Sequence, residues 1–198
     1  MRVRDENKEK TIRKKAIEII VSKGFDGLSM QKLAKASGVS PATIYIYYKN
    51  REDLLNSLYI EVNEAFAAEA LKNFDPSASL EKGLWQQWKN RLDFILKHPL
   101  YFQFFEQFRN SPLVHHKDVT NHAFKESMQL FVRNAIRKKE MAKMEPELFW
   151  SLCYGSFYSL VKFHLQKRSM MNSSFELTEK KMRTLLKMVI RALKNETN

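Results

Sequence analysis

The sequence has little cysteine, glycine or proline: one, five and five residues out of 198. The single cysteine, Cys153, excludes an internal disulfide framework and a cysteine-based zinc site, and it fits a reducing compartment. So few turn-forming residues disfavour an all-β fold with its many turns. No apolar run approaches the roughly 20 residues that span a bilayer, and the charged N-terminus precedes no apolar stretch. We therefore expect a cytoplasmic protein without a signal peptide.

Acidic residues are also scarce, since 34 Lys and Arg stand against 22 Asp and Glu, a formal net charge of +12. Residues 1–51 hold 12 of these basic and 5 of these acidic residues, whereas residues 52–198 hold 22 and 17. Aromatic residues are skewed the other way, with four in the first part and twenty in the second. This asymmetry predicts a small basic unit with an anionic partner, nucleic acid or a membrane surface, followed by a larger aromatic-rich unit. A solvated basic surface explains the charge alone equally well.

Apolar residues recur at steps of three and four along most of the chain, as in amphipathic helices, and no segment alternates like a strand. Capping residues, Gly and Pro divide this pattern. The expected helices cover residues 10–22, a short stretch from 29 past 34, 41–48, 50 to about 74, 79–97, 100–109, 113–140, 146–167 and 175–194. The span 113–140 is open to a break near residue 117. We predict an all-α fold of about nine helices.

Residues 29–48 follow the plan of a helix-turn-helix, in which the second helix enters the DNA major groove. Ser40 and Pro41 give that second helix a clean start, because Ser caps free amides and Pro suits the first helical position. Thr43 can hydrogen-bond a base edge, and its methyl group can meet a thymine methyl. The tyrosine hydroxyls that follow can donate to phosphates. A helical hairpin with aromatic core residues is the alternative, but three tyrosines in four positions are hard to bury together.

The stretch from Gly24 to Leu55 resembles the N-terminal domain of TetR-family transcriptional regulators. It carries the family's Gly-Val-Ser at residues 38–40, followed by its Thr-(Leu/Ile)-Tyr-x-(Tyr/His)-Phe-x-x-Lys pattern. Two departures are mild: Tyr48 stands where Phe is usual, and Arg51 stands where Lys is usual.

The resemblance implies a transcriptional regulator, most simply a repressor that a small-molecule effector releases from a palindromic DNA operator. It implies a helix-turn-helix domain over residues 1–51 and an effector-binding and dimerisation domain over residues 52–198. The basic arm, residues 1–9, is either a solubilising tail or a minor-groove contact. The residues expected at DNA are Ser29, Met30, Gln31, Ser40, Pro41, Ala42, Thr43, Tyr45, Tyr47, Lys49 and Arg51. Those at the family's core positions are Leu28, Leu33, Val39, Ile44 and Tyr48.

The aromatic residues of the second part suit a helical bundle that holds a flat or apolar ligand, although an ordinary aromatic core explains most of them as well. The candidate pocket residues are Trp85, Trp88, Tyr101, Phe102, Phe105, Glu106, Phe124, Tyr154 and Tyr158. An inward Glu106 would favour a cationic ligand, and an exposed Glu106 is an equal alternative. No cofactor or metal is expected.

The last two predicted helices combine small residues with a wide apolar surface, which indicates a homodimer interface. The candidate interface residues are Leu152, Gly155, Ser156, Ser159, Phe163, Leu185, Met188 and Val189. The alternative is that the chain's own core takes up this surface.

An enzyme is the main competing class, because His115, Asp118 and His122 would align on one helix face as metal ligands. No His-Glu-x-x-His pattern, phosphate-binding loop or nucleophile elbow accompanies them. Cys153 lies among apolar residues and suits packing better than nucleophilic attack. An RNA-binding or membrane-surface protein is a third class, but it leaves the recognition-helix chemistry unexplained.

Overall fold

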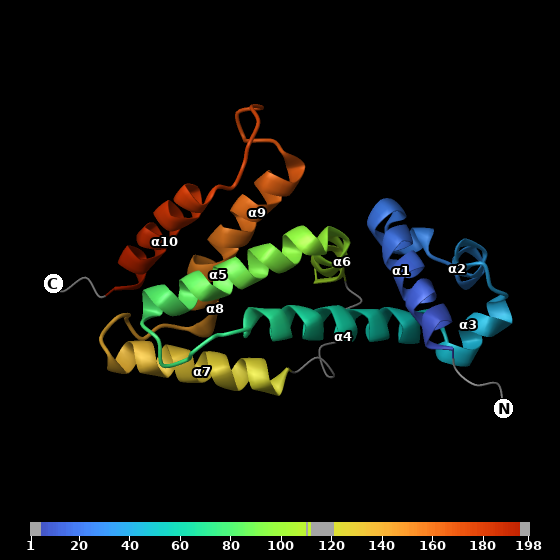
Figure 1. Ribbon diagram of the computed structural model, residues 1–198, viewed down its shortest axis with the longest axis horizontal. Helices are drawn as coiled ribbons and strands as arrows, with labels where there is room; N and C mark the ends of the chain where they lie inside the picture. Colours follow the sequence, from blue (N-terminus) through green and yellow to red (C-terminus); the bar gives the residue numbers. More distant parts are fainter. Residues whose placement is uncertain (1–4, 110, 112–120, 195–198) are drawn as a thin grey trace. The chain divides into compact units, whose positions relative to one another are not determined.

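The computed structural model describes residues 5–109, 111 and 121–194, and the described chain is all-helical, without a strand (Figure 1). The fold class predicted from the sequence is confirmed. In chain order the helices are α1 Glu6–Lys23, α2 Met30–Ser37, α3 Pro41–Tyr47, α4 Arg51–Ala70, α5 Leu80–Lys97, α6 Pro99–Arg109, α7 His122–Arg137, α8 Pro146–Trp150, α9 Ser156–Gln166 and α10 Glu179–Leu193. A short 3₁₀ turn, Phe25–Gly27, lies between α1 and α2.

Helices α8 and α9 are two parts of one helix. The five residues that join them, Ser151–Gly155, form a π-helical turn, and Ser151, Gly155 and Ser156 keep right-handed helical backbone angles. This continuous element confirms the helix predicted over residues 146–167, and with it counted once the described chain has nine helices. Such a turn shifts which side chains face inward beyond it.

Several helix ends differ from the prediction. The first helix begins at Glu6 rather than near residue 10, because Asp5 caps the amides of Asn7 and Lys8. Part of the predicted basic arm is therefore helical, and residues 1–4 lie outside the described chain. At the other end, Thr178 caps Lys181 and starts the last helix four residues later than expected.

Other ends are set by tertiary contacts. Helix α4 ends at Ala70 instead of near residue 74, where the amide of Asn90 donates to the carbonyls of Ala70 and Lys72, at 3.3 and 2.7 Å. The described part of the helix predicted over 113–140 begins at His122, and most of its first turns lie outside the described residues.

The chain divides into two compact units: unit 1 comprises Met1–Ala67 and Phe94–Asn121, and unit 2 comprises Ala68–Asp93 and His122–Asn198. Helices α4 and α5 contribute residues to both. The predicted domain boundary at residue 51 stays a prediction about function, since unit 1 also contains α6.

In unit 1, an aromatic stack connects α4 to α6. The ring of Tyr59 lies 4.4 Å from that of Phe108 and 5.6 Å from that of Phe105, both in stacked geometry. Phe25, in the turn after α1, meets Phe108 edge-on at 5.6 Å. These contacts fix α6 against the helices that carry the helix-turn-helix.

In unit 2, Trp88 is the centre of the core. It is fully buried, stacks on Phe157 at 5.1 Å and donates its indole N–H to the carbonyl of Cys153 at 2.9 Å. Burial raises the pKa of the Cys153 thiol to about 12, so the residue is a packing element, as its apolar neighbours in the sequence indicated. Among the described residues, none of the helices has the length and apolar character of a membrane span.

Gly83, on α5, leaves room for the ring of Phe131 on α7. A Cβ at residue 83 would lie 2.3 Å from Cε2 of this ring, and Phe131 is fully buried and cannot swing aside. Overpacking costs about 1–3 kcal/mol, more than the ~1 kcal/mol by which Ala exceeds Gly in helix propensity. We expect Gly83→Ala to lower the free energy of unfolding by about 1 kcal/mol, measured by denaturant titration.

A Phe131→Leu background provides the control for this prediction. The smaller side chain makes room, so Gly83→Ala should cost less in that background than in the parent. A Gly83→Ala protein as stable as the parent would show that the close packing is not a constraint.

Candidate nucleic-acid interface

The turn between α2 and α3 is built from capping residues. Ser29 accepts from the amide of Lys32 at 3.2 Å and starts α2, and Ser40 accepts from the amide of Thr43 at 3.2 Å and starts α3. Between them, Gly38 adopts the left-handed conformation (φ 68°) that ends α2. Helix α3 therefore begins at Pro41, as predicted.

Helix α3 has a buried face and an exposed face. Ile44 is fully buried, and Tyr48, the C-cap of α3, is 2% exposed. The predicted burial of the family's core positions is therefore confirmed for these two residues, as it is for Leu28 and Leu33. The residues on the opposite face are exposed: Pro41, Ala42, Tyr45 and Ile46. Burying one large aliphatic side chain contributes roughly 1.5–3 kcal/mol, so the inner face holds the helix while the outer face stays available.

The hydroxyl of Tyr48 lies inside a polar cluster made by α1 and α4. Arg13 donates to this hydroxyl from Nε at 2.9 Å, pairs with Glu9 at 2.8 Å and pairs with Glu61 on α4. Burial raises the pKa of Tyr48, and the neighbouring guanidinium opposes that rise in pKa. The tyrosine that replaces the family's usual Phe thus has a partner for its extra oxygen.

Lys49 and Arg51, both predicted to contact DNA, lie in different surroundings. Arg51 is half-buried and donates to the carbonyls of Leu28 at 3.1 Å and Phe25 at 2.5 Å, so its guanidinium binds the turn before α2. These hydrogen bonds give the Arg51 guanidinium a role inside the protein, and its contact with DNA stays a prediction. Lys49 is exposed; its backbone amide donates to Asp53 at 2.8 Å, which leaves the ammonium group toward solvent.

Two further side chains of the predicted DNA set are engaged within the protein. Met30 is only 9% exposed and its side chain packs in the core, so its contact with DNA stays a prediction that this burial does not favour. The hydroxyl of Tyr47 accepts from the amide of Asp5 at 3.0 Å and donates to the carbonyl of Asp5 at 3.1 Å, so it is not free in this structure.

Val39, predicted to be buried, is partly exposed in the turn. Gln31 is exposed at the start of α2, as a base-reading side chain requires.

Comparisons with known proteins agree with this geometry. The family model described as "Bacterial regulatory proteins, tetR family" matches residues 12–58. An HTH-type transcriptional regulator of Haemophilus influenzae is 28% identical over 134 residues, which cover 68% of this chain and 71% of that one. The crystal structure of a TetR family transcription regulator from Marinobacter aquaeolei VT8 covers 99% of this chain and all of its own, with 26% identity and a TM-score of 0.76. The class D tetracycline repressor protein of Escherichia coli is 38% identical over 47 residues, 24% of this chain and 22% of its own.

This chain belongs to the TetR family. It is a DNA-binding transcriptional regulator, with α2 and α3 as its helix-turn-helix. The metal-dependent enzyme finds no support in these relatives. Of the three candidate metal ligands, His115 and Asp118 lie outside the described chain and His122 is exposed. The described residues contain no group of three metal-ligating side chains.

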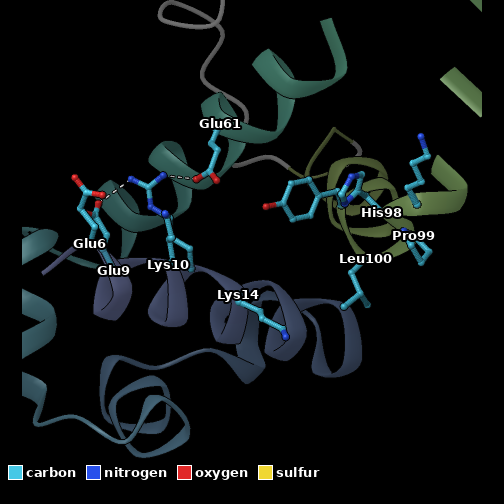
Figure 2. Close-up of a pocket in the computed structure, with 11 residues that line it drawn as sticks. Glu6, Glu9, Lys10, Lys14, Glu61, His98, Pro99 and Leu100 are labelled. Carbon is cyan, nitrogen blue, oxygen red and sulfur yellow. Dashed lines mark hydrogen bonds and ion pairs between the residues drawn. The ribbon is translucent and has the colours of Figure 1, made fainter. Parts of the chain in front are cut away.

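A polar cleft of about 820 Å³ lies within unit 1 of this TetR-family protein, beside the Arg13 cluster (Figure 2). Figure 2 shows Glu9 and Glu61 reaching the same guanidinium from opposite sides, with Lys14 and Leu100 farther along the wall. The cleft also includes Tyr101, whose pKa is raised by burial and by the nearby Glu61 carboxylate. Of the nine predicted pocket residues, only Tyr101 lines this cleft.

The other predicted pocket residues of unit 1 lie on α6. Phe102 is buried, Phe105 packs on Tyr59 and Phe66, and Glu106 pairs with Arg109 on its own helix at 3.5 Å. The ion pair removes the main reason to expect a cationic ligand at Glu106.

Five predicted pocket residues lie in unit 2, separate from the four in unit 1. Trp88 is a core residue rather than a wall, as its stacking and hydrogen bond show. The ring of Trp85 is covered by the Arg183 guanidinium at 4.1 Å. Phe124, Tyr154 and Tyr158 gather around one side chain, Arg91, which was not among the predicted pocket residues.

The signal for this residue was present in the pattern of α5. Its inward positions run at helical spacing, and three of them hold polar residues, Gln87, Asn90 and Arg91, where apolar ones are expected. Ile46 was also missed, because a β-branched apolar residue beside a core position suggests burial, yet it is 38% exposed on α3.

The predicted dimer residues divide by exposure. Met188 is 60% exposed and Ser159 is exposed, whereas Leu152, Gly155, Ser156, Phe163 and Leu185 are partly covered. Val189 is 5% exposed because it packs inside its own chain, so it offers little surface, and its place in the interface stays a prediction.

Lys49 and Arg51 give a paired prediction on DNA binding. Lys49→Met should remove one phosphate contact. The negative slope of log K against log salt should then become shallower by about 0.9, and the free energy of unfolding should not change. Arg51→Met should keep the parental slope but lower the free energy of unfolding by roughly 1.5–3 kcal/mol, because it removes hydrogen bonds from a charged donor. Salt titrations of DNA binding and denaturant unfolding of both variants are the measurements. Equal losses of slope would place both side chains at phosphates.

Proposed function

We propose that this regulator is a repressor, which binds a two-fold symmetric operator as a homodimer and leaves it when a small-molecule effector binds the helices of unit 2. The observation that carries the proposal is the exposed face of α3 above the buried Ile44 and Tyr48. The similarity of this region to a tetracycline repressor supports repression rather than activation.

The residues on the outer side of α3 and just after it divide into two groups, those that would read base edges and those that would contact the DNA phosphates. Thr43 shares a 2.9 Å hydrogen bond with the hydroxyl of Ser40 at the start of α3, so both polar groups are placed where the helix would meet base edges. Ala42 leaves space beside them, and the exposed Tyr45 and Lys49 suit phosphates. One such helix contacts too few base pairs for useful specificity, which is why two copies are required.

The dimer is supported by the apolar surface at the end of the chain. Helix α10 buries Met182, Leu186 and Leu193 in its own unit, yet it leaves Met188 60% exposed on another face. Leu148, on α8, is 55% exposed. A second copy of this chain would cover such residues, as in a two-fold interface.

The operator prediction follows from the dimer. Sequences selected by the pure protein from random duplex DNA should form an inverted repeat, with half-site centres about 34–36 Å apart or at a longer multiple of the helical turn. The protein should sediment as a dimer at micromolar concentration, and Met188→Glu should shift it toward monomer and weaken operator binding. Met171→Glu is the control, because Met171 is 87% exposed in the loop before α10.

Selection of a single unsymmetrical half-site, or a monomeric parent protein that binds its selected DNA, would contradict the proposal. An unchanged dimer in Met188→Glu would move the interface away from α10.

Effector release has a thermodynamic signature. If the effector lowers operator affinity, the operator must lower effector affinity by the same factor, and a coupling of roughly 1–3 kcal/mol gives a 5–150-fold effect. The effector is expected to have an apolar or aromatic body, since α5, α7 and α8 contribute the rings of Trp88, Phe124 and Trp150 to unit 2.

A further inference from the structure

Arg91 is a buried cation in the middle of unit 2. It lies on α5 and is only 4% exposed, although arginine is among the residues least often buried without a partner. Its head group reaches two neutral acceptors: it donates to the hydroxyl of Tyr158 at 2.8 Å and to the side-chain carbonyl of Gln87 at 3.4 Å. The Nε–H has no hydrogen-bond partner.

The neutral acceptors of Arg91 are themselves held in place. Gln87 accepts from the hydroxyl of Tyr154 at 2.7 Å and donates its amide to the sulfur of Met128 at 2.9 Å. Burial raises the pKa of Tyr154, so this hydroxyl stays protonated and acts as the donor. The network orients the guanidinium but supplies no negative charge.

Aromatic rings surround the same guanidinium. Its central carbon lies 4.7 Å from the ring centre of Tyr154, 5.4 Å from that of Phe124 and 5.8 Å from that of Trp150. These rings come from three successive parts of unit 2: α7, α8 and the π-helical turn (Figure 1). Phe124 and Trp150 are only partly buried, so part of this set of rings is accessible from solvent.

This arrangement lacks a counter-charge. Across the described residues no carboxylate pairs with Arg91, whereas Arg13 pairs with two and Arg183 with one. Contacts with ring faces offset part of the cost of burying a cation, about 0.5–2 kcal/mol each, but a buried charge without an ionic partner remains expensive. A guanidinium fork with a free N–H fits a carboxylate, sulfonate or phosphate group.

We propose that unit 2 binds an organic anion whose acidic head group pairs with Arg91 and whose apolar body lies against Trp150 and Phe124. This inference rests on the proposed effector site and specifies its ligand as anionic, the opposite sign from the cation suggested by Glu106. Arg91 is the charge-selecting residue, and the rings of Phe124 and Trp150 select an apolar body.

Two dyes with one aromatic framework test the charge preference directly. 8-Anilino-1-naphthalenesulfonate carries a sulfonate, and N-phenyl-1-naphthylamine is its neutral counterpart; both become fluorescent in an apolar site. We expect Arg91→Met to weaken binding of the sulfonate at least about tenfold, the worth of a hydrogen bond to a charged group, and to leave the neutral dye within about twofold.

Two variants complete the comparison. Arg91→Lys keeps the charge and should retain most of the preference for the sulfonate, and Lys89→Met removes an exposed cation from the same helix and should change neither dye. Equal weakening of both dyes in Arg91→Met, or no weakening of either, would overturn the proposal and make Arg91 a structural residue. If Arg91→Met does not fold, Arg91→Lys and the parent decide, because a parent without preference for the anionic dye also overturns it.

Operator binding by the same proteins separates this inference from the proposed switch. If the sulfonate binds through Arg91 and also weakens operator binding, both stand. If it binds through Arg91 and operator affinity does not change, the anion site stands and the effector switch at this site fails. Loss of operator binding in Arg91→Met with both dyes bound normally would contradict the anion site alone.

Discussion

The guanidinium of Arg13 is the contact on which the DNA-binding surface depends. It joins α1 to the end of α3 through Tyr48 and to α4 through Glu61, while Glu9 orients it from one turn away on α1. Ion pairs this exposed contribute little to stability by themselves. Their effect here is geometric, because the hydroxyl they surround belongs to the residue that ends the recognition helix.

Basic residues therefore have two roles in unit 1, and net charge alone does not separate them. Arg13 and Arg51 donate to groups inside the protein and hold the helix-turn-helix in shape, whereas Lys49 keeps its ammonium group in solvent. The same distinction holds in unit 2, where Arg91 is buried among rings and the neighbouring Lys89 is exposed. A formal net charge of +12 attracts nucleic acid in general, but only the basic side chains that are exposed contribute to the salt dependence of binding.

Local sequence signals predicted the fold and the position of the recognition helix. Helical periodicity, the Ser40-Pro41 start and the turn at Gly38 act over a few residues, so they are visible in the sequence alone. Long-range partners were not visible: Arg51 binds carbonyls more than twenty residues earlier, and Trp88 bonds to the backbone of Cys153, 65 residues later. Those pairings depend on how helices pack, which a one-dimensional pattern does not specify.

Operator affinity of Arg13→Met as a function of salt tests this account most directly. If Arg13 positions α3 without touching DNA, affinity for the selected operator should fall about tenfold or more while the salt slope stays parental, and Lys14→Met, at an exposed position of the same helix, should leave α3 in place. If the slope of log K against log salt became shallower by about one, Arg13 would instead be shown to contact a phosphate. Unchanged affinity would contradict the central claim that this guanidinium holds the recognition helix in its DNA-binding position.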